Sequence, residues 1–182
     1  MPADNLVVVV VSPRLLFAAL LATTGCDRVF GLPDHPGSTN ADAAVAACPF
    51  APNRYAAFEE LHDWKSAELA CEALDPYPDD DVYVHLAVIN QSAEILQLPR
   101  ALTDAWVGLL DRDATMNWQW ITDEPTDPIP WDTGEPNSTS SGPKCGEVDS
   151  SHPAIGDAGC RGATDAYICE CDGFPAVAAR IY

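Results

Sequence analysis

Residues 64–71 of the chain read WKSAELAC, a stretch with the periodicity of an amphipathic α-helix. Trp64, Ala67, Cys71 and, just beyond this stretch, Leu74 recur at the spacing that places side chains on one face of a helix. Asp63 precedes them at the position where a side chain caps the first helical turn. We therefore predict a helix here, with a tryptophan and a cysteine on its buried face.

Outward from this helix, the sequence predicts short strands and one long loop. Ser92 is predicted to cap a short second helix that runs to Leu98 and is ended by Pro99. Strands are predicted at residues 85–89, 105–109, 117–121, 145–148 and 166–170. Residues 122–144 hold five prolines and two glycines without periodicity, and so long a loop inside a compact domain is usually functional. Two early helices followed by short strands are typical of an α+β domain.

The composition favours an exported globular protein. The chain has 182 residues, of which 47% are hydrophobic, enough for one packed domain. Its 28 acidic residues outnumber 9 basic ones, and the net charge of -19 disfavours nucleic acid and anionic membrane surfaces as partners, but not divalent cations. The seven cysteines include no CxxC pair, and the four histidines lack metal-ligand spacing. Disulfides formed in an oxidising compartment are therefore favoured over zinc.

The first residues carry the pattern of an export signal. Arg14 precedes an apolar core at residues 15–21, and the interruption at residues 12–14 argues against a membrane-spanning helix. Residues 22–26 then read ATTGC. This segment resembles the lipobox of bacterial lipoproteins, in which small residues precede an acylated cysteine.

The lipobox resemblance implies a membrane-anchored protein. We expect a lipoprotein-type signal peptide over residues 1–25, lipid attachment at Cys26 and a flexible tether over residues 26–47, which mix Gly, Pro, Ser and Ala. The product would be an exported, membrane-anchored lipoprotein, either in the periplasm or on the cell surface. The alternative is a plain cleaved signal that leaves Cys26 free or paired.

Five further segments carry a joint resemblance. They are W-x-x-A-x-x-x-C at residues 64–71, L-A-x-I with a later Glu at 86–94, W-V-G-L at 106–109, W-D-T-G-E-P-N at 131–137 and Y-I-C-E at 167–170. In this order they resemble the C-type lectin-like domain family. The resemblance covers about residues 48–172 and leaves residues 173–182 as a C-terminal tail. It implies an α+β fold with two helices, short and mostly antiparallel sheets and a long loop, stapled by disulfides.

The family pattern also implies disulfide pairs. Two of its bridges correspond to Cys71–Cys169 and Cys145–Cys160. The first closes a loop of nearly the whole domain and would contribute about 4–5 kcal/mol in the chain-entropy account. Cys48 and Cys171 remain, and we expect them to join the start and the end of the domain, with Cys26 set aside for lipid.

In the sugar-binding members, calcium sits at the long loop on oxygen ligands, and two sugar hydroxyls complete its coordination. Of the five ligand positions, this chain keeps Glu135, Asn137 and Asp157. The other two positions hold Pro143 and Gly156, which lack side-chain oxygens. The resemblance thus implies a weak calcium site, with a mannose-like preference if the Glu-Pro-Asn triplet is active. The alternative is that this triplet serves only as a rigid turn.

Three further carboxylates lie near these positions in the sequence, but spacing does not place them. They are Glu147, Asp149 and Glu124.

We predict a binding module rather than an enzyme. A surface-displayed module that recognises carbohydrate is one hypothesis, and a calcium-independent protein-binding or structural domain is the other. The expected partner is accordingly a glycan or a protein. The acidic pairs Asp111/Asp113 and Asp123/Glu124 are the carboxylates available for acid–base chemistry, but no nucleophile–base pair accompanies them.

The tryptophans are assigned mostly to packing. Trp106, Trp118 and Trp131 are expected in the core and at the base of the loop. Trp120 is the better candidate for an outward-facing platform on which a sugar ring stacks.

Overall fold

The computed structural model describes residues 48–75, 82–91, 93–99, 104–126, 128–149 and 152–181, without the side chains of residues 149 and 152. All of them belong to one compact unit, residues 37–182. Its elements are β1 (Tyr55–His62), α2 (Trp64–Glu72), β2 (Tyr83–Leu86), the 3-10 turn η1 (Glu94–Leu96), β3 (Ala105–Asp111), β4 (Gln119–Trp120), β5 (Lys144–Asp149), β6 (His152–Gly159), β7 (Asp165–Asp172) and η2 (Ala178–Arg180). The expected signal peptide, Cys26 and the tether lie outside the described residues.

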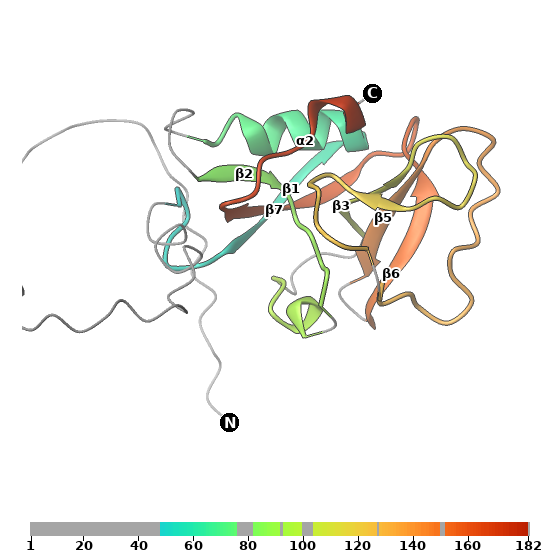
Figure 1. Cartoon of the computed structure of the whole chain (residues 1–182), viewed down its shortest axis with the longest axis horizontal. Coiled ribbons are helices and arrows are strands. Elements are labelled where there is room, and N and C mark those ends of the chain that lie inside the picture. The colour runs from blue at the N-terminus through green and yellow to red at the C-terminus, as the bar shows by residue number, and fades with distance from the viewer. Residues whose placement is uncertain are drawn as a thin grey trace, which may run out of the picture. The chain divides into compact units, whose positions relative to one another are not determined.

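The strands form one sheet with the order β1-β7-β3-β5-β6, to which β2 adds on β7 and β4 on β3. The β3–β7 pair is parallel, and the other pairs are antiparallel. Helix α2 lies beside β1 and β2, while the long loop lies beside β6 at the other end of the sheet (Figure 1). This α+β architecture is the one that the sequence predicts.

The predicted helix forms as α2. Trp64, Ala67 and Cys71 are fully buried, and the Asp63 carboxylate accepts a hydrogen bond from the Ser66 amide at 2.8 Å. The Trp64 indole donates to the Val107 carbonyl at 2.8 Å, which fixes the helix against the central strand β3. An apolar helical face with a capping aspartate therefore suffices to predict this element.

The second predicted helix is wrong as an α-helix. The described residues between Asn90 and Pro99 contain only the single turn η1 (Glu94–Leu96), and Ser92 lies outside them. A segment this short gains few helical hydrogen bonds for the cost of nucleating a helix, and tertiary contacts of Ile95 and Leu98 hold it instead.

The strand predictions hold in part. β3 and β7 form where apolar runs indicate them, whereas β2 starts earlier than predicted and β4 shrinks to two residues. The sequence does not predict β1 or β6. Strand β1 is rich in Ala and Glu, and β6 contains Pro and two Gly, so neither has the composition of a strand. Both instead form through backbone pairing to an adjacent strand.

Three disulfides close the domain. They join Cys48 to Cys171, Cys71 to Cys169 and Cys145 to Cys160. These are the three expected pairs. Two of them end on β7, at Cys169 and Cys171, so the last strand is tied both to α2 and to the start of the domain.

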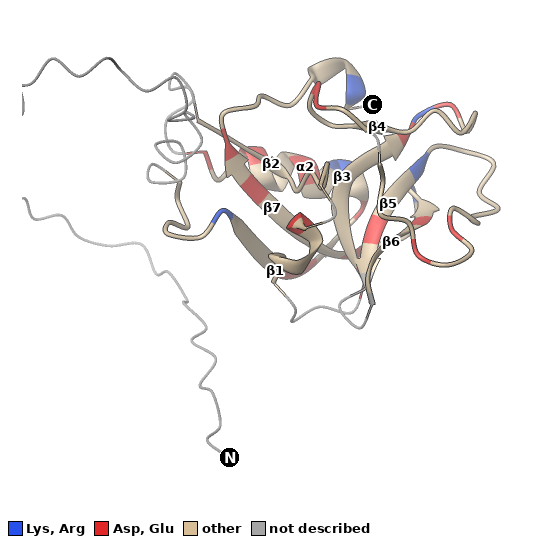
Figure 2. Cartoon of the chain, turned by 60° about the horizontal axis from the view of Figure 1, so that its bottom comes forward, with Lys and Arg blue, Asp and Glu red and all other residues tan. Residues whose placement is uncertain are grey.

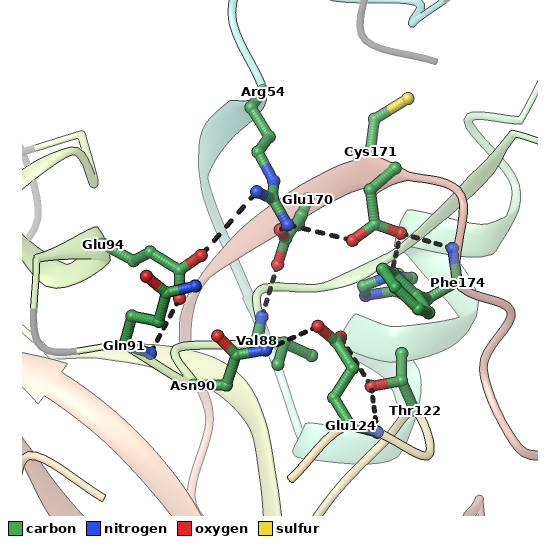
Figure 3. A network of polar contacts seen from close by, with 12 residues as sticks. Arg54, Val88, Asn90, Gln91, Glu94, Thr122, Glu124, Glu170, Cys171 and Phe174 are labelled. Carbon is green, nitrogen blue, oxygen red and sulfur yellow. Dashed lines mark hydrogen bonds and ion pairs between the residues drawn. The ribbon is translucent and has the colours of Figure 1, made fainter. Parts of the chain in front are cut away.

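A buried polar network surrounds the same end of β7 (Figure 3). The guanidinium of Arg54 contacts Glu170 and lies 3.1 Å from Asp172 and 3.7 Å from Glu94. Glu170 also accepts a hydrogen bond from the Val88 amide at 2.6 Å. The network therefore links the start of β1, η1 and the chain that follows β2 to the last strand.

His85 is the second cation of this network. Its Nε2 lies 3.2 Å from the Asp172 carboxylate, and its Nδ1 lies 2.9 Å from the Leu86 carbonyl. Both partners are acceptors, so both ring nitrogens must donate, and the fully buried ring is an imidazolium. Burial alone would lower its pKa, but the hydrogen bond to Asp172 and the negative charge of Glu170 raise the pKa of His85 to about 9.

Residues after Asp172 pack onto the domain. The Val177 amide donates to the Ile121 carbonyl at 2.8 Å, and Arg180 donates to the Trp120 carbonyl and pairs with Asp123 at 2.8 Å. Trp120 is fully buried. The prediction that it faces outward as a sugar-stacking platform is therefore wrong, because the C-terminal segment covers β4.

Candidate functional site

The long loop returns to the sheet beside β6. Trp131 forms a bridge with Ile155, whose amide donates to the Pro130 carbonyl at 2.9 Å. The Asp132 amide donates in turn to the Ile155 carbonyl at 2.9 Å. This pairing brings the Glu-Pro-Asn triplet of the loop to Asp157, two residues further along β6.

Glu135, Asn137 and Asp157 come together as the sequence indicates. The Asp157 Oδ1 accepts hydrogen bonds from the backbone amides of Asn137 at 2.5 Å and Ser138 at 2.8 Å. The side-chain amide of Asn137 donates to Glu135 Oε1 at 2.6 Å. Glu135 Oε2 lies 3.4 Å from the Asp157 amide. The peptide bond between Glu135 and Pro136 is cis.

Asp157 has a second oxygen without a partner. The residue is only 7% exposed, and among the described residues Oδ2 is buried without a hydrogen-bond donor. A buried carboxylate oxygen normally has a hydrogen bond or a cation beside it. The carboxyl group of Asp157 lies next to that of Glu135, so two groups of like charge face each other.

Negative charge accumulates around this pair. Burial, and after it the Asp157 carboxyl group, raise the pKa of Glu135. Burial raises the pKa of Glu147 to about 7, with further contributions from Asp104, Asp165 and Glu135. Figure 2 shows acidic residues on β5 and on the loop beside β6. No lysine or arginine among the described residues forms an ion pair with Glu135, Glu147 or Asp157.

The donors at this site suit a hard divalent cation in kind but are few in number. Carboxylate and amide oxygens are the ligands that calcium prefers, six to eight of them. Pro143 offers no side-chain oxygen, and its carbonyl accepts from the Cys160 amide at 3.1 Å. Within the described part of the chain, no three acidic, histidine or cysteine side chains already converge as metal ligands. The unpartnered Asp157 oxygen nevertheless fits a cation beside Glu135 and Asn137.

Of the three further carboxylates that the sequence offers, only Glu147 can be placed at this site. Glu124 binds the Asn90 side chain at 2.6 Å and the Thr122 hydroxyl at 2.9 Å, so it belongs to the network of Figure 3. The side chain of Asp149 is outside the described residues. Glu147 is the one that lies at the site, because its cross-strand partner in the β5–β6 pair is Gly156.

A comparison with known families identifies the fold. The family model described as the lectin C-type domain matches residues 60–171, more than half of the chain. The chain belongs to this family. The loop with Glu135 and Asn137 lies within the matched part, as do all the disulfide cysteines except Cys48.

Relatives extend this likeness. The chain is 30% identical over 126 residues to a lectoxin, a C-type lectin of Thrasops jacksonii, and the match covers 64% of this chain and 75% of the relative. It is similar to the cow CD23 carbohydrate-recognition domain, solved in the presence of a GlcNAc2Man3 oligosaccharide, with 26% identity, a TM-score of 0.51 and coverage of 63% and 84%. It shares its fold with the C-type lectin CEL-I of Cucumaria echinata, with 19% identity, a TM-score of 0.54 and coverage of 64% and 88%.

Family membership bears on the function class. Proteins with this domain are generally binding proteins rather than enzymes, and they bind carbohydrates or proteins. The three disulfides suit a protein exposed to an oxidising compartment. Among the residues that the structure describes, no helix is long and apolar enough to cross a membrane.

The carboxylates considered for acid–base chemistry have structural partners. Asp111 is fully buried and accepts from the backbone amides of Thr115 and Met116 at 3.1 and 2.9 Å. Asp123 pairs with Arg180. These side chains close a turn and hold the C-terminal segment.

Three tryptophans pack in the core and at the base of the long loop. Trp118 and Trp131 pack edge to face, with ring centroids 4.9 Å apart, at the base of the long loop. Trp106 is fully buried, and its indole donates to the His62 carbonyl at 2.8 Å. These three residues act as packing groups, which is their expected role.

Proposed function

We propose that this chain is a glycan-binding domain that recognises sugar hydroxyls through a divalent cation held by Glu135, Asn137 and Asp157. The unpartnered Oδ2 of Asp157, buried beside the Glu135 carboxyl group, is the observation that carries the proposal. A calcium ion bound there would supply coordination positions for two adjacent sugar hydroxyls. Asp157 would keep the loop in place through its bonds to the Asn137 and Ser138 amides.

Glu135 and Asn137 supply the direct polar contacts in this proposal. A carboxylate accepts and a side-chain amide donates, so the pair can match both roles of a sugar hydroxyl. The Glu-Pro-Asn order supports a mannose-like preference. The likeness to a cow carbohydrate-recognition domain, solved in the presence of a GlcNAc2Man3 oligosaccharide, supports the same ligand class.

Thermal melting in calcium and in chelator tests this function. A cation that binds only the folded state raises its stability by mass action, about 2.7 kcal/mol at a hundred times the dissociation constant. We expect calcium to raise the melting temperature by several degrees, and Glu135→Gln to remove the rise. A mannose-containing glycan should then bind to the wild type in calcium only. An unchanged melting temperature at millimolar calcium would contradict the proposal.

A calcium-independent protein-binding domain is the second candidate. One observation favours it: Asn137 and Glu135 already bond to each other, so the loop holds its shape without an added ligand. Glycine and proline at positions 156 and 143 point the same way. Under this alternative, calcium would leave both the melting temperature and the loop unchanged, in the wild type and in Glu135→Gln alike.

We further propose that the domain, residues 48–172, is displayed on a membrane by lipid on Cys26. Six of the seven cysteines form disulfides, which leaves Cys26 as the cysteine for this role. Expression in a bacterium with labelled palmitate should label the wild type but not Cys26→Ser. Release of an unlabelled wild-type protein would contradict the anchor and leave the lectin-domain assignment intact.

A further inference from the structure

Glu147 on β5 lies opposite Gly156 on β6, a residue without a side chain. It is the register partner of Gly156, where β5 pairs with β6. A Cβ atom added to Gly156 would lie 3.8 Å from Glu147 Oε1 and 3.7 Å from the Glu135 carboxyl carbon. The two carboxyl groups therefore flank the same small volume, and a glycine keeps that volume free of a side chain.

Asp157 lies close enough for its charge to act on Glu147, as the charge of Glu135 does. It follows Gly156 directly on β6, and its buried Oδ2 has no hydrogen-bond partner. Three carboxyl groups from two strands and a loop therefore lie near one another: Glu135 and Glu147 flank the Gly156 position, and Asp157 is close enough to act on both through its charge. No arginine or lysine of the described chain pairs with them, in contrast to the carboxylates around Arg54.

Pro143, which lies directly before β5, has no side-chain oxygen to act as a ligand. Glu147, within β5, has a carboxylate on the side of the site. We propose that Glu147 is the third carboxylate ligand of the cation site and that Gly156 is the residue that admits it. This inference rests on the proposed cation-dependent function and adds a ligand to it. With Glu147, the site has three carboxylates and the Asn137 amide, and the remaining positions are left for water or sugar.

Calcium titration of the full chain, with its disulfides formed, tests the ligand. Glu147→Gln keeps the size of the side chain and removes its charge, and we expect calcium affinity to fall by about tenfold or more. Asp104→Asn is the matched control, because Asp104 is an exposed carboxylate that acts on Glu147 only through its charge. Solvent and salt screen such a charge, so we expect affinity to change by less than about threefold.

A second readout separates ligation from electrostatics. Europium(III) can replace calcium at oxygen sites, and its luminescence lifetimes in light and heavy water count the water molecules on the ion. We expect Glu147→Gln to add about one water, since water replaces a lost ligand. Asp104→Asn should leave the count unchanged. Melting in chelator shows that each variant is folded.

The outcomes separate this inference from the proposed function. If Glu135→Gln abolishes cation binding while Glu147→Gln leaves affinity and water count as in the wild type, Glu147 is not a ligand and the cation site stands. If the wild type binds no cation, both proposals fall.

Discussion

The molecule holds two groups of carboxylates that differ in what balances their charge. Around β7, Glu94, Glu170 and Asp172 face two cations of the chain itself, Arg54 and His85. Beside β6, the carboxyl groups about Gly156 have no such cation in the described chain, and one buried oxygen lacks any partner. We call the first group closed, because the fold itself brings cations to its carboxylates. The second is open, which is the arrangement expected where a ligand supplies the missing charge.

The largest expected effect tests the closed network. Asp172→Asn removes the charge that faces the His85 imidazolium, and Asp172 is only 2% exposed. Removing one partner of a buried ion pair costs about 3–5 kcal/mol, because the other charge stays buried without compensation. Urea unfolding should show this loss with an unchanged m-value. A loss below about 1 kcal/mol would mean that the network behaves like a surface ion pair.

Stability should also depend on pH through this network. The folded pKa of His85 is raised to about 9, and burial raises those of Glu170 to about 8 and Glu68 to about 7. All three groups bind more protons in the folded state than in the unfolded state. The stability that His85 contributes is therefore complete below about pH 6.5, its unfolded pKa, and is lost as the pH rises through 9.

Melting in chelator between pH 6 and pH 9 measures this dependence. We expect stability to fall across the range, with His85 contributing on the order of 3 kcal/mol. The two glutamates have the same sign and begin to act above their ordinary pKa near 4.5. Constant or rising stability between pH 6 and pH 9 would show that His85 is not an imidazolium.

At the site beside β6, the corresponding Asp-to-Asn substitution should raise the stability of the fold, whereas Asp172→Asn lowers it. Asp157→Asn keeps an oxygen for the Asn137 and Ser138 amides and places an amide donor where Oδ2 has no partner. In chelator, we expect it to stabilise the fold by about 1 kcal/mol, because a repulsion becomes a hydrogen bond to Glu135. Calcium should no longer raise its melting temperature. Destabilisation in chelator would indicate that the Asp157 charge already has a partner in the fold.

Sequence patterns predict the buried helix α2 better than the strands that form the site beside β6. Trp64, Ala67 and Cys71 identify α2, because burial on one helical face leaves a periodic trace. Strand β6 leaves no such trace, since Gly156 and Pro153 are poor strand residues. Glu147 is placed by the register between two strands, which no local spacing encodes. The resemblance to lectin domains supplies Glu135, Asn137 and Asp157, but it does not place Glu147 beside Glu135.

The smallest expected effect on stability concerns the glycine between the carboxylates. Gly156→Ala adds a methyl group at 3.7–3.8 Å from Glu135 and Glu147, an ordinary contact, so stability should change by less than about 0.5 kcal/mol. Gly146→Ala, on the paired strand β5, is the control. Its Cβ would lie 2.8 Å from the Leu109 Cβ, so we expect a loss of about 1–3 kcal/mol.

Calcium affinity should reverse the order of these two variants. The methyl group of Gly156→Ala takes up the volume that the two carboxyl groups flank, and we expect affinity to fall by about tenfold. Gly146→Ala disturbs packing against β3 on the face of β5 that contacts Leu109, so affinity should change less than stability. Equal calcium affinities in Gly156→Ala and the wild type would place the cation away from Gly156. The unpartnered oxygen of Asp157 would then be the only feature that distinguishes the carboxyl groups beside β6 from those around β7 as a cation site.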